Sequence, residues 1–563
     1  MKYTFCLGLL ILSLAVIAAS GQQLVADEYD LLIKNGRIVD GTGAPWYMAD
    51  VAIRADRIVK IGHLGEAKAK RTIDARGLIV APGFIDMLGQ SEDYLLIDPR
   101  AMSKLMQGVT TEVTGEGESI APFNDELLKE RQVYFKRFKV EVDWRTFDGY
   151  FARLERQGIG INLATFVGAT QLREYVVGYN NRPPTSEELE QMKKLAAEAM
   201  EHGVLGISSS LQYIPARFAQ TDELIELAKV AARYGGIYIT HQRSETSKIA
   251  ESLNEVFMIA ERAQIPAEIW HLKVSGKANW GRMPEVLSLI EKARERGLDI
   301  TANQYPYIAA STSLMSCLPP WALEGGPEKM LARLKDPATR ERMKNDIRSD
   351  SSEWENMFAG SGGGKGVLIA STGTKEMQAY EGKNIAEIAA LQNKDELETL
   401  LDFILKDRGR TGAIYFVMNE DDVRAALSKR WIAIGSDNGA RATDGPLAGS
   451  KSHPRGYGTF PRILGRYVRE QKLLSLEDAI HKMTWRAASR VGLRDRGQIN
   501  EGMMADITIF DPEKIIDRAT FENPNQYAEG INYVIVNGTI AIDNGQFTGK
   551  LAGRPLRGPG FRR

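Results

Sequence analysis

Short apolar segments alternate with amphipathic helical segments through the middle of this 563-residue chain. The apolar segments are rich in β-branched residues and are bordered by glycine or polar residues, a pattern typical of buried strands. Between most of them, apolar residues recur at helical spacing; residues 186–202 are an example, with Gly203 directly after the predicted helix. The predicted strands cover residues 83–88, 109–115, 160–168, 203–210, 236–241, 267–271, 298–306 and 431–437. Eight strand–helix units predict an α/β fold, a (β/α)8 TIM-like barrel.

The two ends of the chain have a different texture. Residues 21–80 and 491–563 contain short alternating segments joined by turn signals, and Asn537-Gly538 mirrors Asn35-Gly36. We therefore predict one small β-sandwich domain built from both termini, in preference to two separate modules. The barrel domain is expected over residues 81–490.

The connection between the seventh and eighth predicted strands is abnormally long. A gap of about 125 residues should carry structure of its own. We predict an inserted subdomain at about residues 312–425, lying over the barrel mouth and able to act as a lid. Its segment GSGGGKG lacks the spacing of a phosphate-binding loop, so a flexible loop is expected there.

The first 20 residues resemble a secretory signal peptide. Lys2 precedes an apolar run that ends in the small residues Ala18, Ala19 and Ser20. The alternative is a membrane anchor, but the run is short for a span. We expect an exported enzyme, periplasmic or secreted, with no stable membrane insertion after cleavage. Cleavage would leave Cys317 as the only cysteine, which excludes an internal disulfide.

Composition is that of an ordinary globular protein. Hydrophobic residues make up 43%, charged residues 26%, and the formal net charge is −1. The charge balance and the absence of a basic cluster argue against a nucleic-acid partner. Nothing in the sequence indicates an oligomeric state.

Three predicted strands end on side chains suited to metal-assisted hydrolysis. His241 closes GGIYITHQR, His271 closes AEIWHLK, and Asp437 closes WIAIGSD. In a (β/α)8 barrel the strand C-termini form the active-site rim. Two imidazoles there can hold Zn²⁺, and a carboxylate can move protons between water and a leaving amine. A single such histidine is more often a hydrogen-bonded core residue. His453, near the eighth predicted strand, is expected to shape a loop rather than to bind metal.

Longer segments carry a family resemblance. The segments are APGFID (81–86), QGVTTEVTG (107–115), GVLGISSSLQY (203–213), GGIYITHQRSE (235–245), HLKVSGKANWG (271–281), QYPY (304–307), IGSDNG (434–439), HPRGYGTFPRILGRYVRE (453–470) and GMMADITIFDP (502–512). They resemble the amidohydrolase superfamily, and within it the N-acyl-D-amino-acid deacylase (D-aminoacylase) family. The resemblance implies a barrel with a β-sandwich domain and zinc-dependent hydrolysis of an amide on a D-amino acid.

The resemblance also implies roles for individual residues. His241 and His271 match the family's histidine ligands, and Asp437 matches its catalytic acid/base. Tyr213, Lys273 and Tyr305 match positions that line the substrate site. Arg243, Arg455 or both are candidates for holding the substrate carboxylate, with a structural ion pair as the alternative for each.

Two departures from the family pattern bear on the metal site. Leu88 and Gln90 stand where the family usually has His-x-His, which favours one zinc ion over two. The segment GEGES stands where the family commonly has Gly-Asn-Cys-Gly, and simple register puts Gly117 in the place of the cysteine. We predict that the loop is shifted by one residue, so that Glu116 is the third zinc ligand, with Glu118 as the fallback.

The predicted function is zinc-dependent cleavage of N-acyl-D-amino acids or related small amides by metal-activated water. One alternative is a dipeptidase or a cyclic-amide hydrolase of the dihydroorotase or hydantoinase kind. A second is a barrel that binds peptides without catalysis, favoured by the loss of both upstream histidines. The retention of His241, His271 and Asp437 argues against this second alternative.

Overall fold

The structure is a computed structural model that describes residues 28–349, 354–449 and 451–562. The predicted signal segment, residues 1–20, lies outside the described residues. Within the described ranges, no helix is long and apolar enough to cross a membrane.

The centre of the molecule is a barrel of parallel strands, as predicted. Phe166 separates β8 from β9 within one continuous run, and a parallel bridge between Gly89 and Asn438 links the ends of the first and last strands. These contacts connect the two parallel sheets, ordered β6-β7-β8 and β9-β10-β11-β12-β13-β17. The strands are β6 (Phe84–Asp86), β7 (Val109–Thr114), β8 (Asn162–Thr165), β9 (Val167–Gly168), β10 (Gly206–Ser210), β11 (Ile237–His241), β12 (Ala267–Ile269), β13 (Ile300–Gln304) and β17 (Ile432–Ile434).

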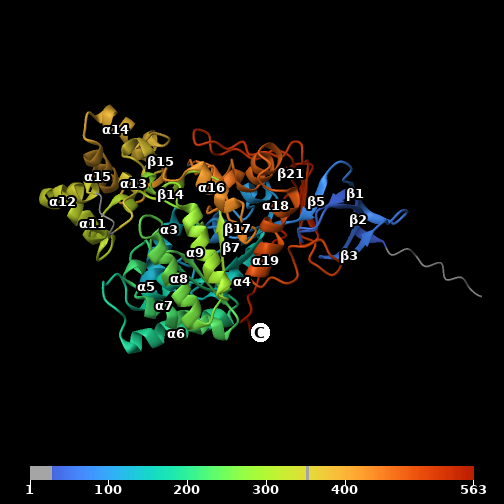
Figure 1. Ribbon diagram of the computed structural model, residues 1–563, viewed down its shortest axis with the longest axis horizontal. Helices are drawn as coiled ribbons and strands as arrows, with labels where there is room; N and C mark the ends of the chain where they lie inside the picture. Colours follow the sequence, from blue (N-terminus) through green and yellow to red (C-terminus); the bar gives the residue numbers. More distant parts are fainter. Residues whose placement is uncertain (1–27, 350–353, 450, 563) are drawn as a thin grey trace, which may run out of the picture.

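Helices cover the outside of the barrel (Figure 1). The one predicted over residues 186–202 is α6 (Ser186–Glu201), which begins with a capping box between Thr185 and Glu188 and buries Met192, Ala196 and Met200. The other covering helices are α1 (Glu92–Ile97), α2 (Met102–Leu105), α3 (Asp125–Lys136), α4 (Phe147–Gln157), α5 (Ala169–Val176), α7 (Thr221–Arg233), α8 (Ile249–Ala263), α9 (Met283–Glu295), α16 (Glu420–Leu427), α17 (Arg455–Arg462), the π-helical η6 (Ile463–Glu470), α18 (Leu476–Met483) and α19 (Trp485–Arg490).

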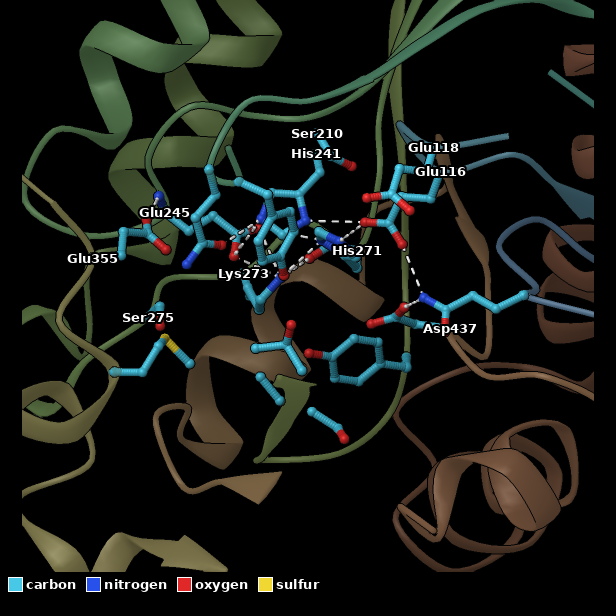
Figure 2. A pocket seen from close by; sticks show the side chains of 18 of the residues that line it. Glu116, Glu118, Ser210, His241, Glu245, His271, Lys273, Ser275, Glu355 and Asp437 are labelled. Carbon is cyan, nitrogen blue, oxygen red and sulfur yellow. Dashed lines mark hydrogen bonds and ion pairs between the residues drawn. The ribbon is translucent and has the colours of Figure 1, made fainter. Parts of the chain in front are cut away.

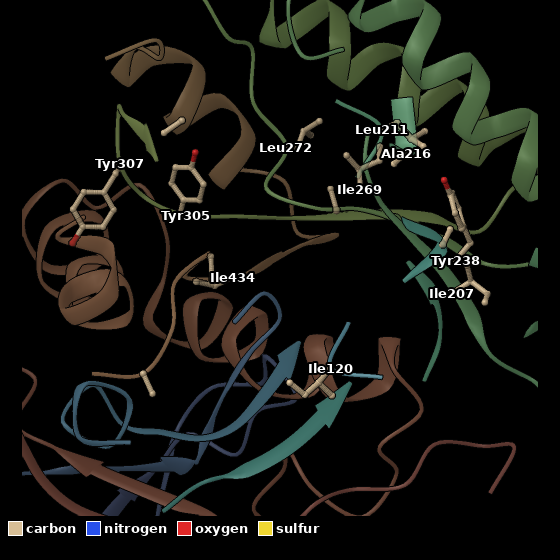
Figure 3. Packing of buried hydrophobic residues seen from close by; sticks show 14 of the residues in the cluster. Ile120, Ile207, Leu211, Ala216, Tyr238, Ile269, Leu272, Tyr305, Tyr307 and Ile434 are labelled. Atoms are coloured by element: carbon tan, nitrogen blue, oxygen red, sulfur yellow. The ribbon is translucent and has the colours of Figure 1, made fainter. Parts of the chain in front are cut away.

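Apolar side chains from several strands fill the barrel region. Figure 3 shows Ile269 of β12 and Ile434 of β17 among the buried residues, with Tyr305 just beyond the end of β13. All three are at most 1% exposed.

The insert between β13 and β17 is a compact subdomain at one end of the molecule (Figure 1). Its sheet has the order β14-β16-β15, with both pairs antiparallel. The segment GSGGGKG forms a turn in which Gly364 N–H donates to Glu396. The insert comprises β14 (Ala310–Ser313), α10 (Pro320–Leu323), α11 (Pro327–Lys335), α12 (Pro337–Arg348), α13 (Met357–Gly360), β15 (Val367–Ser371), α14 (Ile385–Gln392), α15 (Glu396–Lys406) and β16 (Gly412–Tyr415).

The β domain lies at the opposite end and joins both parts of the chain, as predicted (Figure 1). The N-terminal strand β5 pairs antiparallel with the C-terminal strand β18, with Val80 opposite Ile509. The strands are β1 (Tyr29–Ile38), β2 (Tyr47–Arg54), β3 (Arg57–Gly62), β4 (Ala69–Asp74), β5 (Ile79–Pro82), β18 (Ile507–Phe510), β19 (Ile531–Val536), β20 (Thr539–Asp543) and β21 (Gln546–Phe547).

A fully buried ion network ties the first strands of the barrel to the loop after the last one. Lys104 Nζ donates to Asp86 (2.7 Å), to Ser436 Oγ (2.8 Å) and to the carbonyl oxygen of Asn438 (2.8 Å), and lies 3.5 Å from Glu112. Lys104, Asp86 and Glu112 are each 0% exposed. The network fixes the backbone on both sides of Asp437.

Candidate active site and metal centre

Three strand ends bring the predicted catalytic side chains to one rim of the barrel. His241 is the last residue of β11, whereas His271 and Asp437 lie just beyond the ends of β12 and β17. His271 and Asp437 have φ angles of +36° and +50°, in the left-handed region that non-glycine residues rarely occupy. Such backbone outliers concentrate at functional sites, where the surrounding structure holds them in place.

Glu116 reaches the same rim from the loop after β7. Gly115 and Gly117 flank it with positive φ angles, and a Cβ atom on Gly117 would lie 2.4 Å from the side chain of Ser210. Ser208 of β10 pins this loop, because its hydroxyl donates to the Gly115 carbonyl and accepts from Gly117 N–H. The close approach of the loop to β10 therefore requires glycine on the C-terminal side of Glu116.

The predicted ligands Glu116, His241 and His271 converge on one point (Figure 2). Glu116 Oε1 lies 3.0 Å from His241 Nδ1 and 3.0 Å from His271 Nε2. Burial alone would raise the pKa of Glu116, but hydrogen bonds from both histidines hold that pKa well below its usual 4.5. The site thus presents a carboxylate and two ring nitrogens that converge on one another.

The trio fits a tetrahedral zinc ion. Zinc bonds near 2.0–2.1 Å place neighbouring tetrahedral ligand atoms about 3.3 Å apart, and the ligand atoms here lie within 4.8 Å of one another. The outer ring nitrogens have partners of their own: His241 Nε2 lies 2.8 Å from Gln212 Oε1, and His271 Nδ1 lies 3.2 Å from Glu245 Oε1. Such contacts fix which nitrogen faces the metal.

Glu245 and Lys273 form a buried pair beside His271. Lys273 Nζ lies 2.7 Å from the Glu245 carboxylate and 2.8 Å from His271 Nδ1. Burial opposes ionisation of Glu245, but the charge of Lys273 and the two histidines lower its pKa to about 2. Glu245 is therefore a carboxylate at neutral pH and can accept the His271 Nδ1–H.

Asp437 is held from two sides. Arg455 Nη1 forms an ion pair with Asp437 Oδ2 at 2.8 Å, and the Gln90 amide donates to Asp437 Oδ1 at 2.8 Å. Burial raises the pKa of Asp437 against the opposing charge of Arg455. A raised carboxyl pKa favours a group that alternately accepts and donates a proton.

These groups surround a cavity of about 310 Å³. Among the other predicted substrate residues, Lys273, Tyr213 and Tyr305 line it, as does Glu118, which stands outside the metal-binding trio. Arg455 is fully buried behind Asp437, with its guanidinium 4.5 Å from the Tyr305 ring centre.

Arg243 is placed elsewhere. Its guanidinium pairs with both oxygens of Glu255 at 2.8 and 2.9 Å and donates to the carbonyls of Arg217 and Ala219. It lines a neighbouring cavity, separated from Asp437, so this arginine makes the structural ion pair that was its alternative interpretation.

Sequence reasoning missed Glu245, Gln212 and Glu355. Glu245 and Gln212 lie within the family-like segments of the sequence. Glu245 follows His241 by four residues and Gln212 directly precedes Tyr213, so both could have been predicted as site residues from these neighbours. Glu355 comes from the insert, is 5% exposed, and accepts a hydrogen bond from Glu245 N–H. No local pattern marks it.

The whole chain, and not only this site, is similar to known proteins. The amidohydrolase family profile matches residues 71–542. A D-aminoacylase from Alcaligenes xylosoxydans xylosoxydans is 36% identical over 94% of this chain and 98% of its own. A solved D-aminoacylase has a TM-score of 0.78 to this chain at 35% identity, and the match covers 94% of this chain and all of its own. That enzyme has a binuclear metal centre, described as showing one-metal activation and second-metal attenuation. The N-acyl-D-glutamate deacylase from Bordetella bronchiseptica has a TM-score of 0.78 at 31% identity, over 94% of this chain and all of its own. It was solved with zinc and a phosphonate mimic of the tetrahedral intermediate.

Proposed function

Because the chain belongs to the amidohydrolase family, in its D-aminoacylase branch, we propose that it is a zinc-dependent deacylase of N-acyl-D-amino acids. The observation that carries the proposal is the convergence of Glu116, His241 and His271 beside Asp437 in one cavity. It is a hydrolase of carbon–nitrogen bonds other than peptide bonds, like the relatives it matches.

Glu116, His241 and His271 would hold one zinc ion. When bound, zinc supplies Lewis acidity, which polarises the scissile carbonyl and makes water a nucleophile at neutral pH. Asp437 takes the proton from the attacking water and returns it to the leaving nitrogen. Its contacts with Arg455 and Gln90 hold the carboxylate in one orientation for both transfers.

Lys273 is the basic group best placed to anchor the substrate carboxylate or acyl oxygen. Among the described residues that line the main cavity, it is the one lysine or arginine, and it is buried beside His271. Tyr213 and Tyr305 close the walls on either side of the histidine pair, with ring centres 5.1 Å from His241 and 6.5 Å from His271 respectively. Together they place aromatic rings on two sides of the proposed reaction site.

The cavity walls favour a substrate with a neutral side chain. Glu118 and Glu355 line both the main cavity and an adjoining one of about 220 Å³. That adjoining cavity is also lined by the cation Arg217 and by apolar groups that include Ile214, Met315 and Trp354. Two carboxyl groups stand there against the single guanidinium of Arg217, so a second substrate carboxylate would meet a net negative charge above the pKa of Glu355. We therefore propose that N-acyl-D-glutamate is a poor substrate.

A side-by-side assay tests the function. Zinc-loaded enzyme is incubated with N-acetyl-D-leucine, N-acetyl-L-leucine, an L-D dipeptide and a cyclic imide, and the released amine or acid is quantified. We expect turnover of the N-acetyl-D-amino acid to exceed the others. Selective hydrolysis of the dipeptide or the imide would assign the chain to that class, and turnover of none would favour the binding-only barrel.

We also propose that the protein is exported, on the basis of the signal-like residues 1–20. N-terminal sequencing of the mature protein from the periplasm or medium tests this. Recovery of the full-length chain from the cytoplasm would contradict it.

A further inference from the structure

The Gln90 side chain lies between the two carboxylates that face each other across the candidate active site. Its amide nitrogen donates to Glu116 Oε2 at 3.0 Å and to Asp437 Oδ1 at 2.8 Å. Only this orientation of the amide is favourable, because its oxygen would otherwise face two carboxylates. Both amide hydrogens are therefore used, one for each acid.

Two carboxylates this close to a shared partner would normally repel each other unless a cation lay between them. The amide supplies two donors without adding charge. Leu88, at the other position where the family has histidine, is 0% exposed and packs with Met87 and Trp270 in the core. Neither residue therefore offers a metal ligand on this side of Glu116.

We infer that Gln90 is a positioning residue whose amide takes the place of a second metal ion between Glu116 and Asp437. It holds the Asp437 carboxylate on one edge while Arg455 holds the other at 2.8 Å. The inference rests on the proposed zinc-dependent function. It implies that excess zinc does not attenuate this enzyme, in contrast to the second-metal attenuation described for the related D-aminoacylase.

Metal stoichiometry tests the inference independently of activity. The wild-type protein and the double variant Leu88→His/Gln90→His are saturated with zinc, freed of loose metal by gel filtration, and analysed for bound metal. We expect one equivalent in the wild type and two in the double variant. Two equivalents in the wild type would overturn the inference, as would one equivalent in a correctly folded double variant.

A second test measures enzymatic activity as the zinc concentration is increased. We expect wild-type turnover to reach a plateau with zinc, and turnover of the double variant to rise and then fall. Gln90→Leu should keep one zinc equivalent but lose about 10- to 100-fold in kcat, the usual cost of removing a partner of a metal-site group, with KM changed far less. Wild-type inhibition by excess zinc, or an unchanged kcat in Gln90→Leu, would contradict the inference.

Controls separate the possible failures. Gln191→Leu, on the exposed face of α6, makes the same chemical change away from the site and should match the wild type. Circular dichroism and melting curves confirm folding of each variant. If wild-type protein binds one zinc ion but hydrolyses no N-acyl-D-amino acid, the proposed function fails while the stoichiometric result still stands.

Discussion

In the proposed zinc site, metal retention should depend on Glu116, because its carboxylate supplies the oxygen that both histidine nitrogens face. Glu116→Ala should weaken zinc binding by more than about 100-fold, since loss of even an outer partner costs 10- to 100-fold. Glu116→Cys should retain zinc, because a thiolate is a good ligand at a slightly longer distance. Competition with a chromophoric chelator measures both; equal affinity of Glu116→Ala and wild type would exclude Glu116 as a ligand.

Asp437 carries the proton in the proposed reaction. Asp437→Asn keeps the shape of the side chain but removes the basic oxygen, so kcat should fall by about 10²- to 10⁴-fold. Bound zinc should remain at the wild-type level, because the metal-binding trio is intact. Near-wild-type turnover of this variant would assign the proton transfer to another group.

Zinc affinity should rise with pH. In the ion-free site His271 is buried and lies next to Lys273, and both effects lower its pKa; Glu245 and Glu116 outweigh them and raise it to about 9. Zinc must therefore displace a proton below that pH. The dissociation constant should fall about tenfold per pH unit between pH 7 and 9, measured by titration with a buffered chelator. A flat profile would show that His271 is already neutral when zinc binds.

At the scale of single elements, β6, β7 and the loop after β17 are joined through Lys104. Removing one partner of a buried ion pair leaves an uncompensated charge, which typically costs about 3–5 kcal/mol. Lys104→Met should lower the free energy of unfolding by that amount, because it leaves the buried carboxyl groups of Asp86 and Glu112 without their cation. Chemical denaturation followed by fluorescence gives the value.

Lys70→Met is the matched control. Lys70 lies 2.7 Å from Asp30, but its side chain is 68% exposed, so solvent screens the pair. Its denaturation midpoint should stay at the wild-type value. Similar losses of unfolding free energy in both variants would show that the buried Lys104 network stabilises the protein no more than the exposed Lys70 pair does.

The strands could be predicted from the sequence because each is a short apolar run between glycines or polar residues. The histidines and Asp437 followed from their places at the strand ends. The two arginines could not be told apart, because Arg243 finds Glu255 on α8 whereas Arg455 finds Asp437 on another part of the rim. Pairings of this kind depend on three-dimensional packing, which local sequence does not encode.

At the scale of the whole molecule, the insert completes the substrate cavity. Glu355 comes from the insert and accepts a hydrogen bond from Glu245 N–H in the barrel. Burial, and next the charge of Glu245, raise the pKa of Glu355 to about 7. Glu355 should therefore be protonated below that pH and ionised above it.

This titration should appear in substrate choice. The ratio of kcat/KM for N-acetyl-D-leucine to that for N-acetyl-D-glutamate should rise between pH 6 and 8 by about three- to tenfold, the size of a screened charge interaction. Titrations of the shared catalytic groups cancel in the ratio. In Glu355→Gln the ratio should stay flat, and an equally steep rise in this variant would assign the effect to another group.

The pairing of β5 with β18 sets the order in which the chain can be finished during synthesis. Ile79–Pro82 is synthesised more than four hundred residues before Ile507–Phe510. One edge of β5 therefore has no β18 to pair with while the whole barrel is being synthesised. An open strand edge invites pairing with other chains. Contacts this distant in sequence also form slowly. Truncation just before Ile507, which removes β18, should thus yield aggregation-prone protein even though it spares every group of the active site.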